Sequence, residues 1–133
     1  MDGLYPAVVG DDDDGTMPNN VAYFAEQIVG HRIVSAAYDR DPSYDEAKLI
    51  LKLDNGKYVR LFDTSDCCAY TQLVDIIELL PMMDHVITNV TPDLNYNTWH
   101  IFCDFGEMMQ LHVGWSSGNS FYYGYGFHIQ VTE

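Results

Sequence analysis

The sequence predicts an α+β fold, in which a curved, mostly antiparallel β-sheet or partly closed barrel of about six strands carries two short helices. Three observations indicate this class. Two pairs of β-prone segments flank turn sequences, as in hairpins. The C-terminal segment 125–131 alternates apolar with small or polar residues at a period of two. Two other segments space their apolar residues as on one face of a helix.

The length and composition predict one folded domain over residues 19–133, preceded by an acidic flexible tail over residues 1–18. No apolar run is long enough to span a bilayer, and the N-terminus lacks the basic and apolar regions of a signal peptide. The three cysteines show no disulfide framework. We therefore expect a cytoplasmic protein that does not contact membranes.

The charge is unevenly distributed. The net charge is −14, and all six basic residues lie between positions 32 and 60. Direct binding to nucleic acid is disfavoured, because neutralising phosphates requires Lys and Arg. An acidic surface favours a partner protein with a basic surface, although acidity also keeps an aromatic-rich chain in solution. Both interpretations stay open.

The first predicted elements are a helix and a strand. Residues 21–29 place their apolar side chains on one face of a helix, which Asn19 or Asn20 caps and Gly30 ends. Residues 31–38 follow as a strand, closed by a turn-rich stretch.

The clearest local signal is a hairpin. Residues 47–53 and 57–62 flank Asn55-Gly56, which favours a two-residue type I′ turn because both central residues need positive φ. This loop pairs Ile50 with Leu61, so that both faces of the hairpin carry apolar residues. The pattern indicates a sheet covered on two sides, or a closed barrel.

The second half of the chain contains a predicted helix and further strands. Residues 71–80 carry an apolar stripe at helical spacing, and Pro81 stops the helix. Residues 84–90 form a short strand, and residues 99–113 form a second hairpin around Gly106-Glu107.

The glycine- and aromatic-rich segment before the last strand is the candidate binding site. Flat aromatic faces beside small polar groups suit stacking on a nucleotide-like ring, or a hot spot for a protein partner. Alternatively, these aromatics close the end of a small barrel as part of the core. The candidate residues are Trp115, Ser116, Asn119, Tyr122, Tyr123 and Tyr125.

The cysteines and histidines offer a weaker metal site. Cys67 and Cys68 precede the predicted second helix and, with His100 or His112, could bind zinc. Adjacent cysteines point in different directions, which favours two small apolar residues in the packing. The predicted register of the second hairpin places His100 and His112 on opposite faces, unless a bulge changes it. We therefore expect no metal and no other cofactor.

Five segments together resemble a known family. They are 29–36, 66–71, 84–88, 99–106 and 114–127, with the sequences VGHRIVSA, DCCAYT, DHVIT, WHIFCDFG and GWSSGNSFYYGYGF. The match is to small acidic proteins of unknown function encoded by actinobacterial bacteriophages and their hosts. The resemblance implies a viral origin and the host cytoplasm, and it supplies no catalytic residue. Ser117 stands where the family often has cysteine.

Three functions follow from these patterns, in this order. The first is a non-enzymatic phage accessory protein that binds and neutralises a host factor, as a DNA mimic or an inhibitor of host defence. The second is a binder that sequesters a nucleotide-like signal in the aromatic segment. The third is an enzyme that depends on cysteine or metal. The pattern leaves the target and any homo-oligomer open.

Overall fold

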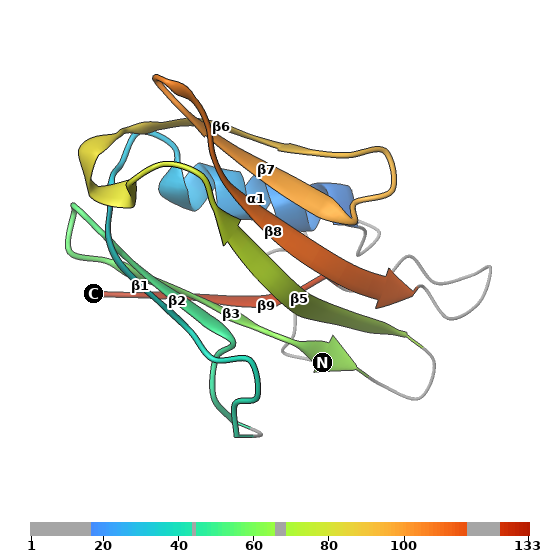
Figure 1. Cartoon of the computed structure of the whole chain (residues 1–133). Helices are drawn as coiled ribbons and strands as arrows, with labels where there is room; N and C mark the ends of the chain where they lie inside the picture. The colour runs from blue at the N-terminus through green and yellow to red at the C-terminus, as the bar shows by residue number, and fades with distance from the viewer. Residues whose placement is uncertain (1–16, 44, 66–68, 117–125) are drawn as a thin grey trace.

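Two antiparallel sheets and one α-helix form the fold of the computed structural model, which describes residues 17–43, 45–65, 69–116 and 126–133 (Figure 1). The four-stranded sheet has the order β1-β2-β3-β9, and the five-stranded sheet, curled like half a barrel, has the order β4-β5-β8-β7-β6. The elements are α1 (Met17–Ile28), β1 (Ile33–Tyr38), β2 (Leu49–Leu53), β3 (Tyr58–Phe62), β4 (Thr64–Ser65), β5 (Tyr70–Glu78), the 3-10 turn η1 (Met82–Asp84), β6 (Ile87–Pro92), β7 (Thr98–Cys103), β8 (Gly106–Ser116) and β9 (His128–Thr132).

The mostly antiparallel β architecture is confirmed, but the predicted inventory is wrong. The described residues contain nine strands rather than about six, and one α-helix rather than two. Across these residues no helix has both the length and the apolar character needed to cross a bilayer.

The core lies between the two sheets, and α1 closes it alongside β6 (Figure 1). The ring of Trp99, on β7, packs between Phe24 of α1 and Phe127 beside β9, with centroids 5.7 Å and 5.3 Å away. The first predicted helix is thus confirmed, and it ends before Gly30. Asn20 is not its cap, because the helix begins at Met17 and Asn20 is buried within it.

The first hairpin exists, but its turn differs from the prediction. The Gly56 amide donates a hydrogen bond to the Leu53 carbonyl at 3.0 Å. Gly56 has a positive φ of 87°, whereas Asn55 does not have a positive φ. These features define a three-residue loop, in which a type I turn is followed by a glycine bulge. Ile50 consequently pairs with Arg60 rather than with Leu61.

That shift of one residue determines which side chains of the hairpin face the core and which face outward. Because side chains alternate along a strand, a one-residue slip moves every side chain to the other face. The leucines of β2, with Val59 and Leu61, are buried against the core. Ile50, Arg60 and Phe62 lie half-buried on the opposite face. Within the described part of the chain only one face of this hairpin is buried, which differs from the expected sheet covered on two sides or closed barrel.

The predicted second helix is a strand. Residues 70–78 form β5, which pairs with β8 and contains a bulge between Leu73 and Asp75. The bulge places Leu73 and Ile76 on the core side, and their spacing of three imitates a helical stripe. Several residues of the segment are β-branched, which lowers helix propensity and favours a strand.

The second hairpin is also confirmed with a different register. Its turn is Asp104-Phe105, and β7 has a bulge after Ile101. Ile101 pairs with Met109 rather than with His112. His100 and His112 consequently lie on the same, outer face of the five-stranded sheet, so their predicted placement on opposite faces is wrong.

Candidate functional site

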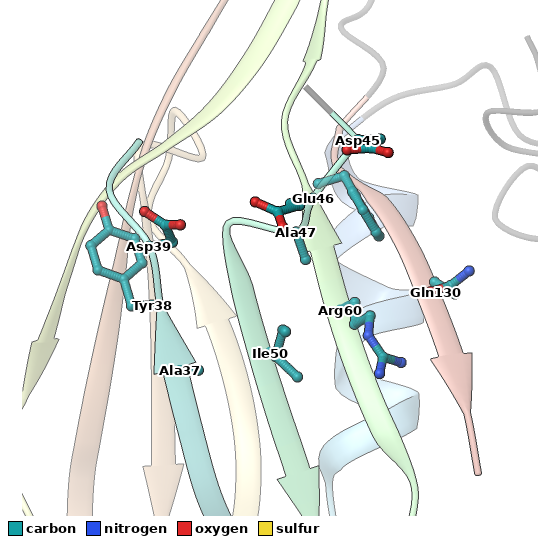
Figure 2. Close-up of a pocket in the computed structure, with 10 residues that line it drawn as sticks. Ala37, Tyr38, Asp39, Asp45, Glu46, Ala47, Ile50, Arg60 and Gln130 are labelled. Carbon is teal, nitrogen blue, oxygen red and sulfur yellow. The ribbon is translucent and has the colours of Figure 1, made fainter. Parts of the chain in front are cut away.

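A row of side chains crosses the outer face of the four-stranded sheet. Ala37 of β1 pairs with Ile50 of β2, Ile50 with Arg60 of β3, and Arg60 with Gln130 of β9. Figure 2 shows these residues on the face of the sheet that points away from α1. The hairpin register therefore creates this row, because the predicted register would turn Arg60 toward the core.

An open hollow of about 470 Å³ lies over this row, and we call it the acidic hollow (Figure 2). Ile50 and Phe62 supply an apolar floor, and Tyr38 lies at its side. Three carboxylates line it: Asp39 at the end of β1, and Asp45 and Glu46 in the segment before β2. All three acidic residues are exposed.

The acidic hollow contains more negative than positive charge. Among the described residues that line it, Arg60 is the one cationic side chain, against three carboxylates. An Arg60 Nη1 donates to Thr132 Oγ1 at 2.6 Å, and the guanidinium lies 5.1 Å from the ring centre of Tyr58. These contacts hold the guanidinium along the sheet. The surplus of carboxylates therefore favours a cationic ligand group over an anionic one.

The three carboxylates of the hollow make no ion pair within the described residues, although Asp39 accepts a hydrogen bond from the Asp41 amide and Glu46 accepts one from the Ser43 amide. Acidic groups nearby are paired with cations. Lys48 Nζ lies 2.8 Å from Asp63, and Arg40 lies 3.5 Å from Asp75. Asp45, in contrast, makes no ion pair or hydrogen bond within the part of the chain that the structure describes. A cation arriving from outside would not have to displace an internal partner of Asp45.

The turn of the first hairpin shows the direction in which pairing shifts the pKa of an exposed carboxylate. Desolvation raises the pKa of Asp54, but hydrogen bonds from the Arg32 backbone and the His31 side chain, with the charges of both residues, lower it. The net pKa lies below the ordinary value of 3.8. His31 Nδ1 is 3.0 Å from Asp54 Oδ1.

The predicted aromatic site is described only at its start. Trp115 is half-buried, packs against the core and donates from Nε1 to the Asn95 carbonyl at 2.7 Å. Ser116 ends β8 opposite Tyr70. The remaining candidates lie outside the described residues: Asn119, Tyr122, Tyr123, Tyr125 and, from the proposed metal site, Cys67 and Cys68.

The structure brings His100 and His112 onto one face, but with polar side chains between them. Glu107 contacts His100 Nδ1 and accepts a hydrogen bond from Gln110 Nε2 at 3.1 Å. Gln110 Oε1 lies 2.9 Å from His112 Nε2. The two imidazoles thus belong to one polar network of four side chains on the outer face of the five-stranded sheet.

Sequence reasoning did not single out the carboxylates of the acidic hollow. Asp39, Asp45 and Glu46 belong to a turn-rich acidic stretch, which by itself is typical of any solvated loop. The signal that distinguishes them is their position beside the outward residues of β2 and β3. That position can be read only after the hairpin register is known.

Comparison with known proteins identifies one match. A family model described as "Domain of unknown function (DUF7448)" matches residues 26–129, which include α1 from Glu26 onward and every strand up to the start of β9. No curated protein and no solved structure shows significant similarity to the chain.

Proposed function

The chain belongs to the DUF7448 family, and we propose that it is a non-enzymatic binding protein that engages a partner protein with a basic surface through the acidic hollow. The observation that carries this proposal is the set of three carboxylates around an open apolar floor. A protein side chain can enter such a hollow from the solvent side without rearrangement of the sheet.

The chemistry of the hollow suits a lysine or arginine side chain. The methylene groups of the partner's side chain would cover Ile50 and Phe62, while the charged end of that side chain would reach the carboxylates of Asp45 and Glu46. Apolar contact and charge contact would then act on the same residue of the partner. Complementary charge of this kind contributes most to specificity and to the association rate.

The overall charge supports a partner of the same kind. A net charge of −14 attracts a basic surface over a longer range than the hollow alone. The resemblance to phage-encoded proteins supports the further proposal that the partner is a host factor in the cytoplasm. The protein would neutralise that factor, for example by covering a surface that otherwise meets DNA.

The proposal is tested with two charge-reversal variants. The immobilised protein is exposed to host extract at low salt, the captured protein is identified and purified, and its Kd is measured for each variant. Asp45→Lys changes the hollow, and Glu26→Lys makes the same change in net charge on the exposed side of α1, behind the sheet.

We expect Asp45→Lys to weaken binding at least about tenfold, which corresponds to 1.4 kcal/mol, and Glu26→Lys to weaken it only about twofold. The wild-type Kd should also rise steeply with salt, because screening weakens contacts between exposed charges. Equal losses in the two variants, or binding that ignores salt, would show that the hollow is not the binding site.

A further inference from the structure

Three chemically different metal-ligand side chains meet at the turn between β7 and β8. His85 precedes β6, Cys103 ends β7, and Asp104 begins the turn. One ligand atom from each lies within 4.8 Å of the other two. The strand pairing causes this meeting, because Ile87 of β6 pairs with Cys103 and so brings the residues before β6 to the turn.

The imidazole of His85 has a buried nitrogen without a hydrogen bond from any described residue. The residue is 8% exposed, and its Nδ1 makes no hydrogen bond within the described part of the chain. The Nδ1 atom approaches Asp104 Oδ1 to 3.3 Å, which is within ion-pair distance but without hydrogen-bond geometry. A buried nitrogen without a partner is costly, and coordination of a metal ion is one way in which proteins offset that cost.

The surroundings hold the cluster in place. The Phe105 ring lies 4.6 Å from the imidazole of His85, although the Phe105 side chain is largely exposed. The Phe105 amide donates to Cys103 Sγ at 3.4 Å. Hydrogen bonds to a sulfur ligand and packing around an imidazole are the outer-shell contacts that orient metal ligands. The same turn therefore provides both ligands and their support.

We propose that His85, Cys103 and Asp104 bind a transition-metal ion of the Zn²⁺ class. Thiolate and imidazole together select zinc-like metals over Mg²⁺ and Ca²⁺, which prefer oxygen ligands. Three protein ligands leave at least one coordination position for water or another ligand. The Asp104 side chain is exposed, so a metal ion can reach the cluster from solvent on that side. This site lies in the other sheet from the acidic hollow, and its existence does not depend on the proposed function.

The experiment uses the full chain after treatment with a chelator. Zn²⁺ is added and the stoichiometry is read by native mass spectrometry, while Co²⁺ is added in parallel because cobalt bound to thiolate gives a charge-transfer absorption band. The variants are Asp104→Asn, Cys103→Ser and a double variant, Cys67→Ser with Cys68→Ser. Asp104→Asn alters an exposed residue, so it tests the site even if Cys103→Ser fails to fold.

We expect the wild type and the double variant to bind one metal ion, to show the thiolate band and to melt at a higher temperature with Zn²⁺. Asp104→Asn should bind at least about tenfold more weakly. Folded Cys103→Ser should lose the band. The proposal is overturned if the wild type binds no Zn²⁺, if Asp104→Asn binds as tightly as the wild type, or if only the double variant loses the band.

Discussion

At the scale of single residues, the side chain of Asn20 bonds to the backbone of Phe127 in the way that a neighbouring strand would. Its Nδ2 donates to the Phe127 carbonyl at 3.0 Å, and its Oδ1 accepts from the Phe127 amide at 2.9 Å. The amide group thus satisfies both backbone groups of a buried residue, which would otherwise be costly. The contact fixes α1 to the segment that leads into β9.

Gly126 allows this contact, and its replacement gives a prediction. A Cβ at Gly126 would lie 2.3 Å from Asn20 Cγ, and its φ of +74° disfavours other residues. Gly56 has a similar φ of +87° but open space around it, so Gly56→Ala is the matched control. We expect Gly126→Ala to lower the free energy of unfolding by about 3–5 kcal/mol and Gly56→Ala by about 1 kcal/mol.

Urea unfolding measures both changes, provided that the m-value stays constant. Similar losses in the two variants would mean that the backbone angle alone matters, and that the contact between Gly126 and Asn20 is not tight.

The sequence could not assign Asn20 this role. An asparagine near a helix start favours a capping position, which is a local inference. The actual partner, Phe127, is 107 positions away along the chain. Likewise His85 and Cys103 meet only through the pairing of β6 with β7, so no short motif connects them.

At the scale of elements, local signals located the two hairpins, while turn geometry and bulges determined the register of their strands. The turn at Gly56 and the apolar segments around it correctly located the first hairpin. The bulges in β5 and after Ile101 depend on packing across strands, so the sequence pattern did not reveal them. A register wrong by one residue concealed the acidic hollow, because it turned Arg60 inward.

Asp63 joins the two sheets, which gives the prediction at this scale. Its Oδ2 pairs with Lys48 beside β2 at 2.8 Å, and its Oδ1 accepts from the Leu73 amide of β5 at 3.0 Å. Asp63→Asn keeps an acceptor for Leu73 but leaves Lys48, whose side chain is only 12% exposed, without its ion pair. We expect a loss of about 1–2 kcal/mol in the free energy of unfolding.

Asp75→Asn is the matched control for Asp63→Asn. Asp75 also accepts a backbone hydrogen bond, from Ile76, and pairs with Arg40, but both side chains of that pair are well exposed. An exposed pair contributes little, so we expect a loss below about 0.5 kcal/mol. Chemical denaturation of both variants compares them, and a loss for Asp75→Asn that matches Asp63→Asn would contradict a special role for the link between the sheets.

At the scale of the whole molecule, the two candidate sites lie on different sheets. The acidic hollow uses the outer face of β1, β2, β3 and β9, while the histidine–cysteine–aspartate cluster uses the turn between β7 and β8. Both sheets pack against the same core, but no described side chain belongs to both sites. Variants of one site should therefore leave the other site intact, which allows each proposal to fail separately.

The net charge of −14 gives the last prediction, because it opposes folding while it favours a basic partner. Like charges repel more strongly in the compact state than in the unfolded chain, and salt screens this repulsion. Raising NaCl from about 0.02 to 0.2 M should therefore raise the melting temperature by a few degrees. The same change should weaken binding to the partner.

A melting temperature that falls with salt would mean that internal ion pairs, such as that of Lys48 and Asp63, outweigh the repulsion. The acidic surface would then not reduce the stability of the fold. If the surface is acidic because it binds a basic partner, added salt should raise the melting temperature and weaken binding at the same time.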